Sequence, residues 1–155
     1  ALPAALHDGS LRVTAVDHQA QEDARRLSWS GDGKASIALL SSTPLDLSRE
    51  SNGDVLLVLT VRPETLPAGD INVGVSCGSG CAAQLPLRDS LAALPKGQWA
   101  TLGIPLKCFA TAGADVSKLD QLLRLETAGK AELSLSRVAL GAMNEAQHVV
   151  KCAVQ

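Results

Sequence analysis

The sequence has few of the features that would direct it to a membrane or a nucleic acid. No apolar run approaches the length of about 20 residues that a membrane-spanning helix needs, and residues 1–6 lack the basic flank and long apolar stretch of a signal peptide. The 14 Lys and Arg residues are scattered and the net charge is −2, so no basic patch is available for a phosphate backbone. We therefore expect a soluble chain, already processed or excised from a longer one, with neither nucleic acid nor membrane as partner.

Recognisable catalytic patterns are also missing. The three histidines, His7, His18 and His148, lie near the two ends of the chain, and no Gly-x-Ser-x-Gly elbow, phosphate loop or dinucleotide fingerprint occurs. Acidic residues number 16 and cluster beside turns, and nothing singles out a pair that could act as acid and base. The sequence therefore predicts no catalytic residue in this chain.

Length and composition predict one domain with a substantial core. A chain of 155 residues that is 46% hydrophobic can bury one core and is too short for two. Short runs of apolar residues separated by turn sequences rich in Gly, Asn and Asp are typical of β-strands. We expect an all-β, antiparallel β-sandwich over residues 1–155, with its core at about 8–140 and a tail at 141–155. The nine predicted strands are Leu11–Val16, Ala24–Ser28, Ala35–Leu40, Val55–Arg62, Ile71–Cys77, Ala83–Pro86, Trp99–Pro105, Leu122–Thr127 and Ala131–Leu140.

Alternation within the strands predicts which side chains face water. In the run 71–77, the odd-numbered residues are apolar and the even-numbered ones are polar or Gly, whereas the run 55–61 is apolar on both sides, as in a covered central strand. The polar positions of these strands are expected to share one sheet face, which is either simply solvated or a ligand groove. They are Thr60, Arg62, Asn72, Ser76, Arg124 and Glu126.

Four cysteines in a small, strand-rich chain favour disulfides. Cys77 and Cys81 flank a glycine-rich turn, which leaves Cys108 to pair with Cys152 and to tie down the tail. In the chain-entropy model, the longer loop contributes about 4 kcal/mol of stability and the shorter one about 2 kcal/mol. A four-thiolate zinc site is an alternative, although its usual pattern has two close cysteine pairs and this chain has one; free thiols are a third.

Several segments occur in the order found in a known family. They are Gln21–Gly31, Gly53–Arg62, the Cys77–Cys81 turn, Trp99–Phe109 with Gly113-Ala114-Asp115, and the return Thr127–Leu140. Together they resemble the C-terminal accessory domain of periplasmic glycoside hydrolase family 3 enzymes, the exo-acting β-glucosidases and glucan glucohydrolases of Gram-negative bacteria. The likeness covers about residues 8–140. It implies a periplasmic or secreted, galactose-binding-like jelly roll, similar to carbohydrate-binding modules, that follows two catalytic domains in one polypeptide.

The resemblance implies two possible roles, neither of them catalytic, because the family's catalytic carboxylates lie in the earlier domains. The module docks on the catalytic domains and stabilises them or, as the alternative, engages β-glucan on a polar sheet face. The ligand contacts predicted for the alternative are Arg62, Asn72, Arg124, Glu126 and Trp29. Many such sandwiches also hold a structural Ca²⁺ near the first strand, for which Asp17, Glu22 and Asp23 are the candidate oxygen donors; no other cofactor is expected.

Scarce aromatic side chains favour docking over sugar binding. Sugars stack on exposed rings, and this chain has two Trp, one Phe and no Tyr. Trp99 stands before an alternating strand and is expected in the core, whereas Trp29 precedes the turn at 31–33 and is either a core residue or a ligand contact. Any glucan binding is therefore expected to be weak, with a Kd near 1 mM, or about −4 kcal/mol.

Overall fold

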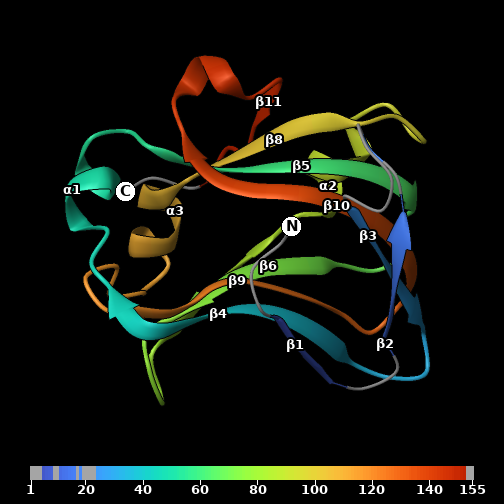
Figure 1. Cartoon of the computed structure of the whole chain (residues 1–155), viewed down its shortest axis with the longest axis horizontal. Helices are drawn as coiled ribbons and strands as arrows, with labels where there is room; N and C mark the ends of the chain where they lie inside the picture. Colours follow the sequence, from blue (N-terminus) through green and yellow to red (C-terminus); the bar gives the residue numbers. More distant parts are fainter. Residues whose placement is uncertain (1–4, 9–10, 17, 19–23, 153–155) are drawn as a thin grey trace.

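Two β-sheets packed face to face make up the molecule (Figure 1). The computed structural model describes residues 5–8, 11–16, 18 and 24–152. Among these residues, the five-stranded sheet has the order β1 (Ala5–Asp8), β4 (Ala35–Leu45), β9 (Leu119–Thr127), β6 (Ile71–Ser76) and β7 (Ala82–Pro86). The six-stranded sheet has the order β11 (His148–Val149), β8 (Ala100–Pro105), β5 (Leu56–Thr65), β10 (Lys130–Gly141), β3 (Ala24–Ser30) and β2 (Leu11–Val16). The predicted all-β sandwich is confirmed.

Neighbouring strands are antiparallel, except that β11 runs parallel to β8. Each of the nine predicted strands has its counterpart, and β1 and β11 are additional. The connections contain the short helices α1 (Ser48–Asn52), α2 (Arg88–Ala92) and α3 (Leu106–Thr111) and the 3-10 turn η1 (Met143–Glu145). Of these, α1 and α3 lie side by side at one end of the sandwich, on the left in Figure 1. Within the described residues, no helix has the length and apolar character needed to cross a membrane.

The core lies between the sheets and consists mainly of Leu, Ile and Val side chains. Alternation in β6 turns Ile71, Val73 and Val75 inward, as the sequence predicts, and β9 contributes Leu123 and Leu125 in the same way. The side chains between these positions lie on the outer face of the five-stranded sheet, and alternation in the other sheet likewise turns side chains to its own outer face. Any polar site built from the strands therefore belongs to one outer face or the other.

The strand β5 is apolar on both sides because the C-terminal segment covers part of its outer side. Leu59 faces the core, while Leu56 faces outward and is nevertheless fully buried. A Cβ atom added to Gly103 on the neighbouring β8 would lie 2.6 Å from Leu56 Cδ1 and 2.8 Å from Ala146 Cβ. Leu56 and Ala146 thus meet over this glycine, where a larger residue has no room.

Both predicted disulfides are present. The Cα atoms of Cys77 and Cys81 are 5.0 Å apart, and those of Cys108 and Cys152 are 5.8 Å apart. No cysteine is free, so the pairing is confirmed and no thiolate is left for a zinc site. In the turn between Cys77 and Cys81, Gly80 has a φ of 74°, a left-handed value that glycine adopts without steric cost.

The longer disulfide joins the C-terminal segment to α3. Residues Cys108 and Cys152 are 44 positions apart in the chain. Beside the bridge, Val150 is buried and its N–H donates to the carbonyl of Gly103 over 2.8 Å. The segment after β10 is therefore held to α3 by a covalent bond and to the six-stranded sheet by backbone hydrogen bonds.

One tryptophan lies in the core and the other on an outer face, and only Trp99 differs from what the sequence predicts. Trp29 on β3 is 2% exposed, and its indole Nε1 donates to the carbonyl of Ala35 over 3.0 Å. Trp99, just before β8, is half-buried on the outer side of the six-stranded sheet. The prediction that Trp99 lies in the core is wrong, because the inward positions of β8 are the even-numbered ones, such as Leu102 and Ile104.

Candidate functional site

The predicted polar face is divided between the two sheets. β5 belongs to the six-stranded sheet, whereas β6 and β9 belong to the five-stranded one. Arg62 therefore lies on one outer face of the sandwich, and Asn72, Arg124 and Glu126 lie on the other. The expectation of one shared face is wrong, because alternation determines the side of a sheet that a residue occupies but not the sheet that its strand joins. Trp29 is on neither outer face, because its side chain packs in the core.

Three predicted contacts do meet on the outer face of the five-stranded sheet. Asn72 of β6 pairs with Glu126 of β9, and Arg124 Nη2 donates to Glu126 Oε2 over 3.1 Å. Lys34 Nζ lies 3.9 Å from Glu126 Oε1, and Gly74 stands opposite Arg124. The described residues of this cluster include no aromatic ring. The cluster therefore offers charged hydrogen-bonding groups without a surface on which a sugar ring stacks.

A second polar cluster crosses the outer face of the six-stranded sheet. Arg62 of β5 stands opposite Ser134 of β10, and Ser134 stands opposite Arg26 of β3. Glu64 accepts at Oε2 from Arg62 Nε (2.8 Å), Arg26 Nη2 (3.2 Å) and Ser134 Oγ (3.3 Å). One carboxylate thus joins two guanidinium groups across three neighbouring strands. With Trp99, these four residues are called the Arg62 cluster below.

The ring of Trp99 lies at one side of the Arg62 cluster. Arg62 Cζ is 4.9 Å from the ring centroid, a cation–π contact. The ring of His18 has its centroid 4.4 Å from that of Trp99 at an angle of 45°, and His18 Nδ1 lies 2.8 Å from Ser136 Oγ. Sequence reasoning misses Trp99, although the alternation of β8 contains the signal. The sequence contains no signal for Arg26, because β3 and β10 pair although they are far apart in the chain.

The charges of the Arg62 cluster leave an excess of hydrogen-bond donors. Two guanidinium groups share the single carboxylate of Glu64, and Arg26 Nε is buried without a hydrogen-bond partner among the described residues. Glycoside hydrolysis usually needs two carboxyl groups facing one cleft, and this cluster has one. Glu126, the carboxylate of the other cluster, lies on the opposite face of the sandwich. The arrangement is suited to binding rather than to acid–base chemistry.

An apolar groove of about 170 Å³ opens at the end of the sandwich near α1 and α3. Strand ends from both sheets line it, together with Leu106 of α3. Leu45 at the end of β4 and Leu140 at the end of β10 are 37% and 44% exposed. Leu40 of β4 (40%) and Met143 just after β10 (54%) are the other large hydrophobic side chains that the described residues expose. Exposed apolar surface therefore gathers on strands that end at this groove.

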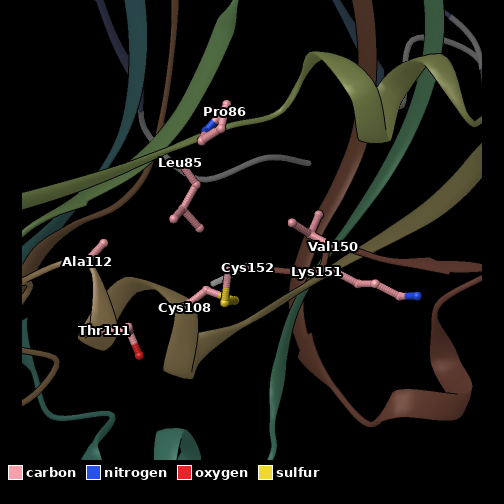
Figure 2. A pocket seen from close by; sticks show the side chains of 8 residues that line it. All are labelled: Leu85, Pro86, Cys108, Thr111, Ala112, Val150, Lys151 and Cys152. Atoms are coloured by element: carbon pink, nitrogen blue, oxygen red, sulfur yellow. A yellow bond between two sulfur atoms is a disulfide. The ribbon is translucent and has the colours of Figure 1, made fainter. Parts of the chain in front are cut away.

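A second hollow, of about 470 Å³, lies beside the Cys108–Cys152 disulfide (Figure 2). Leu85 of β7 points toward the bridge, whereas Lys151 points away from it. Its lining contains neither a carboxylate nor a histidine, so it holds no acid–base pair. We assign it no chemistry.

Turn contacts account for the two lowered carboxyl pKa values. The hydroxyl and backbone N–H of Ser48 donate to Asp46 and lower its pKa, and Ser117 does the same to Asp115. Both acids are fully exposed and interact with residues two positions later, as turn residues do. Neither marks a site.

The calcium prediction stays a prediction. The candidate donors Asp17, Glu22 and Asp23 lie outside the described residues. Among the described residues, no group of three or more His, Cys, Asp and Glu side chains is placed to hold a metal ion.

Comparison with known families agrees with this two-sheet β-sandwich. Residues 3–140 match the family Exop_C, described as galactose-binding domain-like, and the chain belongs to this family. The resemblance seen in the sequence is thereby confirmed.

Solved structures share this fold. The exo-1,3/1,4-β-glucanase ExoP from a Pseudoalteromonas species is 24% identical with a TM-score of 0.74, and the match covers 93% of this chain and 17% of that one. The extra C-terminal domain of ExoP gives 23% identity and a TM-score of 0.75, over 94% of this chain and 78% of that one. A family 30 carbohydrate-binding module from Clostridium thermocellum is 16% identical with a TM-score of 0.67, and the match covers 87% of this chain and 83% of that one. No curated protein matches the chain.

Proposed function

We propose that this chain is a non-catalytic accessory module of a glycoside hydrolase family 3 β-glucosidase or exo-glucanase. It docks on the catalytic domains of the same polypeptide and stabilises them. The likeness to the C-terminal domain of a much longer glucanase supports a position next to catalytic domains. The two disulfides support an oxidising compartment, and we place the parent enzyme in the periplasm or outside the cell.

The apolar groove carries the docking proposal. Burying a whole Leu side chain stabilises by about 1.5–3 kcal/mol, so covering the exposed parts of Leu45 and Leu140 contributes about 1 kcal/mol each. Domains of one chain usually share interfaces of about 600–1,500 Å². The groove with the exposed Leu45 and Leu140 side chains that line it provides the apolar centre that such an interface needs.

Replacing one groove residue in the parent enzyme tests docking. Leu140→Asp is expected to lower the melting temperature of the catalytic domains, because the interface then buries a carboxylate without a partner. In the excised module, the same change is expected to alter stability by less than about 1 kcal/mol, since Leu140 is already exposed there.

The matched control is Ala128→Asp, which introduces the same charge at an exposed turn where β9 and β10 are joined, at their far end from the groove. Docking through the groove is wrong if Leu140→Asp and Ala128→Asp affect the catalytic domains equally.

Binding of β-glucan on a sheet face is the second candidate function. The specific observation in its favour is Trp99, which lies among charged hydrogen-bonding groups on an outer face rather than in the core. Retention of the module in a native gel that contains laminarin, compared with a gel without it, tests this function without assuming a site.

A further inference from the structure

We infer that the Arg62 cluster is a binding site for one neutral pyranoside ring, recognised through its C–H face and two adjacent hydroxyl groups. The inference rests on the second candidate function and is independent of docking. Trp99, Arg62 and Glu64 make the contacts, while Arg26 and Ser134 hold the Glu64 carboxylate in place.

Trp99 supplies the apolar part of the site. Trp99 as a residue is half-buried on the outer face, which leaves it within reach of a ligand. Sugar C–H groups pack on aromatic rings, and no second ring besides His18 contacts Trp99 among the described residues. Because Arg62 and His18 already contact the ring, the remaining surface suits one sugar ring rather than an extended chain.

Arg62 and Glu64 supply a donor and an acceptor side by side. Arg62 uses Nε for Glu64, and its two terminal nitrogens donate to none of the described residues. All three donors to Glu64 meet at Oε2, so Oε1 accepts no hydrogen bond from the described residues. A guanidinium fork matches two neighbouring oxygens, and a hydroxyl group both donates and accepts. A pair of adjacent sugar hydroxyls therefore satisfies both groups at once.

The central carboxylate neutralises one of the two guanidinium charges and so weakens the attraction of the cluster for anionic ligands. A uronate, sulfate or phosphate group that approached Arg62 would also approach Glu64, whose negative charge lies 2.8 Å from the Arg62 Nε atom. A neutral sugar brings no such repulsion. A neutral pyranoside ring with two adjacent hydroxyl groups is therefore the ligand that uses both the donor and the acceptor.

The other outer face provides a built-in comparison. Arg124 and Glu126 repeat the Arg-x-Glu spacing of Arg62 and Glu64 on a single strand, with an ion pair of 3.1 Å. The described residues around them offer no aromatic ring. If charged hydrogen-bonding groups alone sufficed, both faces would bind sugar equally.

An NMR titration of the labelled chain with laminari- and cello-oligosaccharides, up to about 10 mM, tests the site. We expect shifts of the Trp99 indole N–H and of the amides near Arg62. Trp99→Ala and Arg62→Ala are each expected to weaken binding at least about tenfold, as for central aromatic and Arg contacts in interfaces. The matched control Arg124→Ala is expected to bind like the unchanged chain.

Two further variants separate a binding role from a structural one. Trp99→Phe keeps a ring and is expected to weaken binding by less than Trp99→Ala does. Glu64→Gln removes the charge but keeps an acceptor, so it is expected to admit an oligoglucuronide that the unchanged chain rejects.

Several results would overturn the inference. Shifts centred on Asn72 and Arg124, or equal binding by Trp99→Ala, would refute this site while leaving glucan binding intact. Tighter binding of the oligoglucuronide than of neutral sugars by the unchanged chain would refute the ligand class. If no sugar changes any chemical shift, the second candidate function is rejected together with its site.

Discussion

Opening the Cys108–Cys152 disulfide is expected to destabilise the domain about twice as much as opening Cys77–Cys81. The bridged cysteines are 44 positions apart in the first case and 4 in the second. A cross-link restricts the unfolded chain more when it closes a longer loop, by about 4 kcal/mol here against about 2 kcal/mol. Cys152→Ala should therefore lower the free energy of unfolding by about 4 kcal/mol, and Cys81→Ala by about 2 kcal/mol.

The structure also predicts which segment loses stability first when the longer disulfide is opened. The longer bridge holds the segment whose Val150 N–H donates to the carbonyl of Gly103 over 2.8 Å. Without the bridge, the two residue pairs of β11 with β8 and a few hydrogen bonds hold this segment. The Val150 amide should exchange with solvent much faster in Cys152→Ala than in Cys81→Ala.

Urea unfolding of the two variants measures the difference. With a slope of about 2 kcal/mol per M, the midpoint should fall by about 2 M for Cys152→Ala and by about 1 M for Cys81→Ala. The double variant Cys108→Ala/Cys152→Ala removes the thiol left behind and should match the single one. An equal or larger effect of Cys81→Ala would refute the loop-entropy reasoning, and two alkylatable thiols in the native, oxidised protein would refute the pairing itself.

Three further predictions concern activity and packing. The isolated chain should not hydrolyse aryl β-glucosides; turnover that survives repurification and disappears on substitution of one carboxylate would contradict this. Gly103→Ala should lower the free energy of unfolding by about 1–3 kcal/mol in urea titrations, because its Cβ would lie 2.6 Å from Leu56 Cδ1 and 2.8 Å from Ala146 Cβ. Trp29→Phe should cost more than about 1 kcal/mol by losing a buried hydrogen bond and core volume, whereas Trp99→Phe should be nearly neutral. Similar melting temperatures for the two Trp variants would contradict the assigned burial.

Local pattern explains which parts of the fold could be predicted from the sequence. Alternation identifies strands such as β6, whose apolar positions are buried as expected, and the spacing of the cysteines predicts both disulfides. β11 has two residues and therefore no periodicity of its own; it forms where the bridged tail passes β8. The six-residue helix α3 is likewise too short for a helical pattern to appear.

The candidate site needs information that local pattern does not contain. Asn72 and Glu126 are expected together and do pair, but Arg62 is separated from them because β5 and β6 enter different sheets. Arg26 reaches Glu64 only through the pairing of β3 with β10 and of β10 with β5. The outward position of Trp99 could be predicted locally. Leu102 faces the core, and a residue three positions earlier on an alternating strand faces the other side.

The docking groove and the Arg62 cluster occupy different parts of the module, so docking and sugar binding need not compete. Leu57, at the start of β5, lines the groove, whereas Arg62 lies five residues further along the same strand and on its other face. At about 3.4 Å per residue, the two positions are about 17 Å apart along β5. In the parent enzyme, Leu140→Asp should therefore lower thermal stability without weakening retention by laminarin. Arg62→Ala should weaken retention by laminarin without lowering the thermal stability of the parent enzyme. If either variant loses both retention and thermal stability, docking and sugar binding use the same surface.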